Sequence, residues 1–223
     1  MKKLLYKNRK LKLIYFNSKD FESGALKLDE LKKFDGVLVP GGFGVNGVEG
    51  IISAIQYVRK HKIPYLGLCY GMQLAVIEYA RHVAGIKGAH TREVEPEGKA
   101  LVIDVMPEQE ELIAKQNLGG TMRLGAYKCN LKDGTHARKA YGARQIVERH
   151  RHRYEVNPEY IEKLEAAGMI FSGTSPDGRL MEIAELPKSE HPFFLGTQFH
   201  PEFLARPLAP HPLFTAFLRA CKK

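Results

Sequence analysis

The chain has 223 residues, of which 44% are hydrophobic and 26% are charged, as is ordinary for a soluble globular protein. This length predicts one domain spanning residues 1–223. The formal net charge is +9, and a basic protein attracts polyanions. Aromatic residues are not interleaved with the basic ones as base stacking would require, so we expect no nucleic-acid partner.

Targeting signals and metal-binding patterns are missing from the sequence. No apolar run reaches the roughly 20 residues that span a bilayer, and the basic N-terminus is not followed by the apolar core of a signal peptide. The three cysteines, Cys69, Cys129 and Cys221, are too few and too scattered for a disulfide framework or a zinc site. We therefore expect reduced thiols, a cytoplasmic location, no membrane association and no metal site.

Strands and helices alternate in the first half of the chain. Short apolar runs predict strands at 10–16, 36–40 and 65–69. Helical patterning predicts helices at 27–33, 50–62 and 71–85. This alternation indicates an α/β fold with a largely parallel sheet.

The second half is richer in strands. They are expected at 100–105, 122–131, 146–156, 169–174, 179–186 and 193–200, with helices at 158–168 and 213–221. The segment 175–178 (SPDG) is typical of a tight turn between antiparallel strands. The predicted fold is therefore an open, mostly parallel sheet with flanking helices, plus antiparallel strands in the C-terminal half.

The strongest local motif is GLCYGMQ, in which Cys69 lies between an apolar strand and a helix. Gly67 and Gly71 flank it two residues to either side, the pattern of a nucleophile elbow. Such a turn puts the sulfur at a helix N-terminus, which favours a thiolate. Cys129 and Cys221 lack these flanks, so we expect them to be structural.

A base for this nucleophile is expected in FHPEF. His200 ends an apolar strand, where α/β folds present site residues. Glu202 follows after one proline and is placed to hold the imidazole in one tautomer. A third motif, GGFGVNG at 41–47, also follows a strand. It lacks the Lys-Ser/Thr of a phosphate-binding loop and fits an oxyanion hole built from the N–H groups of Gly42 and Tyr70.

Together these motifs resemble the class I glutamine amidotransferases, with a flavodoxin-like fold. Several longer stretches are similar to the CTP synthase family in particular. They include VLVPGGFG, IPYLGLCYGMQ, LGGTMRLG, VERHRHRYEVNP and HPFFLGTQFHPEF, and the similarity extends from about residue 35 to the end of the chain.

The resemblance implies hydrolysis of L-glutamine to glutamate and ammonia through a glutamyl thioester. In it, Cys69 attacks the side-chain amide, His200 carries the proton and Glu202 orients His200. Gly42 and Tyr70 would line the oxyanion region.

The resemblance also implies substrate-binding residues. Gln73 would lie in the same turn and helix as Cys69. Glu93 would bind the amino group of glutamine and Arg151 its carboxylate. Arg123 would lie near a domain interface and a GTP site.

The family's opening strand–helix unit and its amidoligase domain are absent from these 223 residues. ATP, UTP and Mg belong to that amidoligase domain, so we expect no cofactor here, with GTP as an allosteric activator. Ammonia would pass to an amidoligase domain or chain that aminates UTP to CTP, in a complete enzyme that is oligomeric. Asn46 and Tyr70 depart from the family's usual Arg and Leu.

Two other functions remain open at this point. The chain could be the amidotransferase subunit of another synthetase, or a catalytically weak regulatory module that binds glutamine. The intact set of Cys69, His200 and Glu202 argues against the regulatory module.

Overall fold

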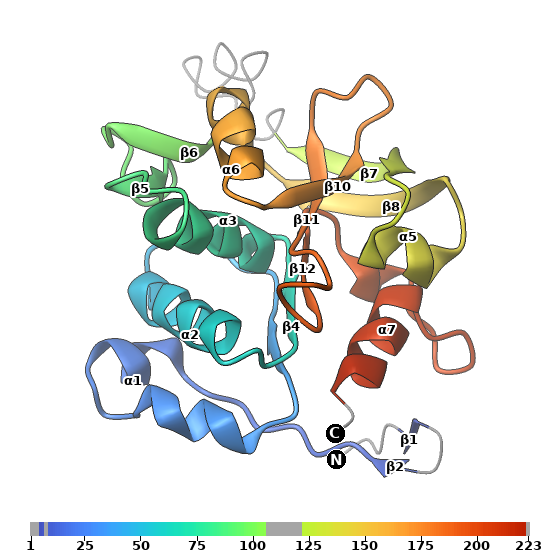
Figure 1. The fold of residues 1–223 in the computed structure, drawn as a ribbon, viewed down its shortest axis with the longest axis horizontal. Coiled ribbons are helices and arrows are strands. Elements are labelled where there is room, and N and C mark those ends of the chain that lie inside the picture. Colours follow the sequence, from blue (N-terminus) through green and yellow to red (C-terminus); the bar gives the residue numbers. More distant parts are fainter. Residues whose placement is uncertain (1–4, 7–8, 106–121, 222–223) are drawn as a thin grey trace.

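A seven-stranded sheet runs through the centre of the molecule (Figure 1). The structure, a computed structural model, describes residues 5–6, 9–105 and 122–221. The strands of this sheet are β3 (Val37–Val39), β4 (Tyr65–Leu68), β7 (Arg123–Leu131), β8 (Gln145–His152), β10 (Ile170–Thr174), β11 (Met181–Glu185) and β12 (Phe194–Thr197). Their order across the sheet is β3-β4-β12-β11-β10-β7-β8.

The predicted α/β class is confirmed, with antiparallel strands in the second half of the chain, but only two of the six described strand pairs in the main sheet are parallel, fewer than the mostly parallel sheet that the sequence predicts. Strands β3, β4 and β12 pair in parallel, and every other pair in this sheet is antiparallel. A smaller sheet contains β5 (Ala89–Thr91), β6 (Ala100–Val105) and β9 (Tyr154–Val156). A short antiparallel pair near the N-terminus is formed by β1 (Leu5–Tyr6) and β2 (Arg9–Lys10).

Helices cover both faces of the main sheet (Figure 1). On one face lie α1 (Ser18–Glu22), α2 (Val48–Lys60) and α3 (Tyr70–His82); on the other lie α5 (His136–Tyr141) and α7 (Pro212–Ala220). The remaining helical segments are α6 (Ile161–Ala166) and the 3₁₀ turns η1 (Leu28–Lys33), η3 (Pro158–Tyr160) and η4 (Pro201–Phe203). The side chains of β4 alternate between the two layers, so Tyr65 belongs to one hydrophobic cluster and Leu66 to the other.

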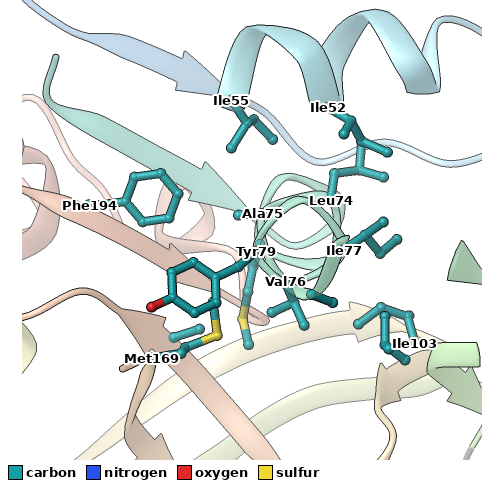
Figure 2. Packing of buried hydrophobic residues seen from close by; sticks show 14 of the residues in the cluster. Ile52, Ile55, Leu74, Ala75, Val76, Ile77, Tyr79, Ile103, Met169 and Phe194 are labelled. Carbon is teal, nitrogen blue, oxygen red and sulfur yellow. The ribbon is translucent and has the colours of Figure 1, made fainter. Parts of the chain in front are cut away.

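Helix α3 lies at the centre of the larger cluster. Residues 70–80 are all buried, which is typical of a helix surrounded by protein on every side. Figure 2 shows Leu74 toward Ile52 of α2 and Val76 toward Ile103 of β6. The helix therefore packs between the central sheet, α2 and the smaller sheet, and its first residue directly follows the expected nucleophile.

Two predicted strands differ from the structure. The predicted strand Lys10–Phe16 is wrong: pairing ends with Lys10, and residues 11–17 are irregular. A strand needs a hydrogen-bonded neighbour, and β3 is the edge of the main sheet, with only β4 beside it among the described strands. The predicted strand 146–156 is divided at Arg153 into β8 and β9, which belong to different sheets.

Helices α2 and α3 are joined by a buried ion pair. Arg59 donates through Nε and Nη2 to the two carboxylate oxygens of Glu78, both at 2.7 Å. The Glu78 side chain is fully buried. A bidentate pair of this kind is directional, and its geometry orients the two helices.

We predict that Glu78→Ala lowers the free energy of unfolding by about 3 kcal/mol or more, because it leaves the charge of Arg59 without its buried partner. Urea denaturation followed by circular dichroism measures the change. Glu30→Ala is the matched control, since it removes the exposed pair with Lys33 and should have little effect. Equal midpoints for the two variants would contradict the prediction.

Candidate active site

Cys69 occupies a strained turn between β4 and α3. Its backbone has φ +48° and ψ −100°, and it is one of only two described non-glycine residues with positive φ. A Cβ added to Gly71 would lie 2.5 Å from the carbonyl oxygen of Val39, and one added to Gly67 would lie 2.7 Å from the backbone of Gly71. The two glycines are thus needed for the close approach of strand and helix, as the elbow motif predicts.

His200 lies beside Cys69 because β12 is the parallel neighbour of β4. The register pairs Thr197 with Leu68, and the backbone N–H of Cys69 donates to the carbonyl of Thr197 at 2.6 Å. His200 Nδ1 lies 2.7 Å from Glu202 Oε1. The imidazole stacks on Phe203 with ring centroids 4.5 Å apart, and its Nε2 is buried and without a hydrogen-bond partner among the described residues.

The glycine loop after β3 closes over these two residues. A Cβ on Gly41 would lie 2.8 Å from Cε1 of His200 and 3.7 Å from the Cβ of Cys69, so both side chains flank one point of the loop. The Tyr70 hydroxyl donates to the carbonyl of Gly44 at 2.6 Å. Tyr70 therefore anchors the loop through its side chain, in addition to the backbone role expected from the sequence. Asn46 lies exposed in the same loop.

Glu93 also binds the glycine loop, at the backbone N–H of Gly44. It follows β5, is half-buried, and accepts a hydrogen bond from the N–H of Gly44 at 2.8 Å. Burial raises the pKa of the Glu93 carboxyl, while that N–H and the charge of Arg153 act against the increase. Arg153 is thus a charged neighbour of Glu93 that the sequence analysis did not single out. The sequence pattern that could have indicated it is RHRHR, of which it is the last arginine.

Arg151 contributes its backbone to the site. Its carbonyl oxygen accepts from the Cys69 thiol, with Sγ and O 3.9 Å apart, while its side chain is exposed on the outer face of β8. The cationic side chain that acts on Glu93 is that of Arg153. Binding of a substrate carboxylate by Arg151 stays a prediction.

Gln73 is connected to Cys69 through hydrogen bonds to Gln198. Its Nε2 donates to the carbonyl of Tyr154 at 3.0 Å and to Oε1 of Gln198 at 3.3 Å. Gln198 in turn donates to Sγ of Cys69 at 3.7 Å. Gln198 was also missed from the sequence, although it lies two residues before His200 and so emerges on the same side of an extended chain.

The buried environment of the Cys69 thiol favours its protonated form. Burial raises its pKa to about 12, and the charges of Glu202 and Glu93 act in the same direction. The N-terminus of α3 was expected to favour a thiolate, but desolvation is the larger effect here. Reaction at this sulfur therefore requires a base that removes the proton.

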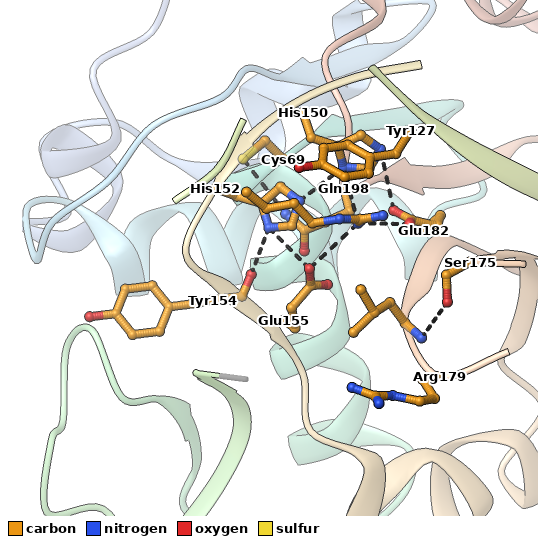
Figure 3. Close-up of polar contacts among 12 residues, drawn as sticks. Cys69, Tyr127, His150, His152, Tyr154, Glu155, Ser175, Arg179, Glu182 and Gln198 are labelled. Atoms are coloured by element: carbon orange, nitrogen blue, oxygen red, sulfur yellow. Dashed lines mark hydrogen bonds and ion pairs between the residues drawn. The ribbon is translucent and has the colours of Figure 1, made fainter. Parts of the chain in front are cut away.

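Arg123 lies inside the protein. Its guanidinium is buried and forms an ion pair of 2.7 Å with Glu182, whose side chain belongs to the polar network drawn with Cys69 and Gln198 (Figure 3). The first part of the LGGTMRLG segment lies outside the described residues. A direct GTP contact by this side chain would require it to leave its buried partner.

The described ranges hold neither a metal-binding cluster nor a membrane-spanning helix. Residues 9–105 and 122–221 contain no group of three or more His, Cys, Asp or Glu side chains suited to a metal ion. No helix in these ranges is long and apolar enough to cross a membrane.

The family model and the curated relatives that match this chain agree with one another. The family model for class-I glutamine amidotransferases matches residues 2–220. CTP synthase of Carboxydothermus hydrogenoformans is 61% identical over 193 residues, which are 86% of this chain and 35% of that protein. CTP synthase of Moorella thermoacetica is 52% identical over 220 residues, 98% of this chain and 40% of that protein. The chain thus spans well under half the length of these curated relatives.

A solved structure supports the same assignment. The glutaminase domain of Trypanosoma brucei CTPS with bound acivicin aligns with a TM-score of 0.85 at 36% identity, covering 94% of this chain and 80% of that chain. A GMP synthase-like protein of Thermoplasma acidophilum, 17% identical with a TM-score of 0.55, shares the fold over 87% of this chain and 76% of its own. The chain therefore belongs to the class-I glutamine amidotransferases, a family of enzymes, and corresponds to the amidotransferase domain of CTP synthases.

Proposed function

We propose that this chain hydrolyses L-glutamine to glutamate and ammonia, with Cys69 as nucleophile, His200 as proton carrier and Glu202 as its orienting partner. The observation that carries the proposal is the convergence of a strained elbow cysteine and a strand-end His–Glu pair beneath one glycine loop. A nucleophile, a base and a group that orients the base are the parts that covalent acyl transfer needs.

The reaction begins with transfer of the thiol proton of Cys69 to His200 as Sγ attacks the amide carbon. The N–H groups of Gly42 and Tyr70 stabilise the oxyanion. His200 then protonates the departing ammonia, which leaves a γ-glutamyl thioester on Cys69. Water activated by the same imidazole hydrolyses the thioester and releases glutamate.

The charged ends of glutamine need an anionic and a cationic partner. Glu93 supplies the anion, at the side of the pocket where it also holds the glycine loop. Arg151 in β8 and Arg153 at the break between β8 and β9 are the candidates for the substrate carboxylate. The influence of Arg153 on the pKa of Glu93 favours Arg153 as the side chain that faces the pocket.

The ammonia is proposed to serve amination of UTP to CTP by an amidoligase domain or chain. This part rests on the names of the curated relatives, which are more than twice as long as this chain. ATP, UTP and Mg would act on that domain, with GTP as an allosteric activator, in an oligomeric cytoplasmic enzyme. Measuring glutamate release with and without GTP and an added amidoligase domain tests this assignment.

We predict that Cys69→Ala abolishes glutamine hydrolysis, because the acyl acceptor is removed. Cys221→Ala is the matched control and should retain activity, since Cys221 is the C-cap residue of α7 and belongs to none of the site motifs. Glutamate release measures both variants. Turnover by Cys69→Ala comparable to that of the unmodified chain would reject the mechanism, whereas an unmodified chain that releases no glutamate would favour the regulatory module.

We predict that alkylation of Cys69 by iodoacetamide accelerates about tenfold per pH unit between about pH 7 and pH 10. Burial raises the pKa of this thiol to about 12, so the reactive thiolate fraction keeps growing over this range. Mass spectrometry of the Cys69 peptide measures the rate. A plateau near neutral pH would instead indicate a preformed thiolate–imidazolium pair.

We predict that Glu93→Gln raises KM for glutamine by about 10- to 100-fold, the loss expected for one charge-assisted hydrogen bond. Glu95→Gln, two residues away and exposed, should leave KM unchanged. Arg151→Met and Arg153→Met, measured in parallel, identify the partner of the substrate carboxylate. An unchanged KM in Glu93→Gln would remove this residue from the binding site.

A further inference from the structure

Strand β8 contacts both residues of the candidate catalytic pair, Cys69 and His200. The carbonyl of Arg149 accepts from the backbone N–H of His200 at 2.8 Å, and the carbonyl of Arg151 accepts from Sγ of Cys69 at 3.9 Å. Both carbonyls belong to β8, which ends the main sheet and has only β7 as a neighbour among the described strands. Its inward side chains must therefore provide much of what fixes its position.

The inward side chains of β8 near the site are two buried histidines. Nδ1 of His150 lies 2.9 Å from Nε2 of His152, and 3.4 Å from Nη1 of Arg123. Nε2 of His150 lies 3.6 Å from Glu182, and Nδ1 of His152 lies 3.3 Å from Glu155. Arg123 also pairs with Glu182 at 2.7 Å. Figure 3 shows this chain of contacts directly beside Cys69 and Gln198.

The donors and acceptors of this cluster restrict where its protons lie. Arginine can only donate to Nδ1 of His150, and the carbonyl of Tyr154 can only accept from Nδ1 of His152, at 3.3 Å. Two neutral rings cannot satisfy both contacts together with the hydrogen bond between them. The protonation of the two carboxyl groups therefore follows from the charges around them and not from the tautomers.

Arg123 is the one cation beside the two buried carboxyl groups of this cluster. Its Nη1 lies 2.7 Å from Glu182 and 3.7 Å from Glu155, and neither oxygen of Glu155 has a hydrogen-bond partner among the described residues. A second buried carboxylate would lack a compensating charge. The cluster therefore contains one neutral carboxyl group, Glu155, and one carboxylate, Glu182, opposite Arg123.

The pKa shifts of the four groups agree with these protonation states. Burial raises the pKa of Glu155 well above its usual value. It raises the pKa of Glu182 to about 7, where Arg123 opposes the increase. Burial also lowers the pKa of His150 to about 2 and that of His152 to about 3, so both rings are neutral.

The cluster reaches His200 as well as Cys69. The ring of His150 packs edge-on against Phe199, with centroids 5.8 Å apart, and Phe199 precedes His200 in the chain. A change in the position of His150 is therefore transmitted both through Phe199 and through the backbone of β8.

We propose that His150 and His152 are positioning residues that hold β8, and through it His200 and Cys69, by means of a protonated Glu155 and an ionised Glu182. The proposal rests on the proposed function, since it explains how the same two residues are aligned. The geometry gives the two buried glutamates opposite protonation states, and this difference can be tested with isosteric substitutions.

The test compares Glu155→Gln with Glu182→Gln. Glu155→Gln replaces a neutral carboxyl group by a neutral amide of nearly the same shape, so we expect kcat and the rate of Cys69 alkylation by iodoacetamide to stay within about threefold of the unmodified chain. Glu182→Gln removes the counter-charge of Arg123, so we expect kcat and alkylation to fall about 10- to 100-fold with KM little changed. Glu185→Gln, also buried but on β11 and bonded to the backbone N–H groups of His136 and Ala137, is the control and should leave kcat unchanged.

Infrared difference spectra provide a readout without turnover. The spectrum of the unmodified chain minus that of Glu155→Gln, both recorded at about pH 9 where Glu182 is ionised, should contain the band of a protonated carboxyl group. A loss of more than about tenfold in Glu155→Gln, a Glu182→Gln variant that matches the unmodified chain, or a missing carboxyl band would each overturn the proposal. If the unmodified chain releases no glutamate, the proposed function fails, while alkylation and infrared spectra still test the positioning.

Discussion

The site depends on the close approach of β3, β4 and the first turn of α3. This contact leaves no space for a side chain at Gly67 or Gly71, and it forces Cys69 into a positive φ that residues with a Cβ rarely adopt. Such strain persists only when the surrounding structure over-determines it. Here the fully buried helix α3 and the parallel neighbours β3 and β12 provide that constraint.

Parallel pairing brings together groups that are far apart in the chain. Because β4 and β12 are neighbours, the residues after their carboxyl ends, Cys69 and His200, meet at one edge of the sheet. Strand β3 ends at the same edge and delivers the glycine loop. The antiparallel half of the sheet adds β8, whose carbonyls contact the residues contributed by the parallel half.

Buried charge recurs in this protein with two different consequences. The pair of Arg59 and Glu78 is bidentate and joins α2 and α3 at residues outside the site motifs. The cluster around Arg123 has one cation for two carboxyl groups, so one of them must stay neutral to avoid an uncompensated buried charge. Desolvation of this kind costs free energy, and the cluster lies where the alignment of Cys69 and His200 benefits from a rigid support.

The sequence by itself determined the α/β class, the elbow at Cys69, and the pairing of His200 with Glu202, because each depends on residues close together in the chain. It did not predict Gln198, Arg153 or the buried cluster as parts of the site, since these polar residues acquire a role only from neighbours that the fold supplies. Residues 10–16 have the composition of a strand, yet they are irregular, because a strand also requires a partner edge. The thiol of Cys69 shows the same division: local sequence places it at a helix N-terminus, but tertiary burial decides that it is protonated.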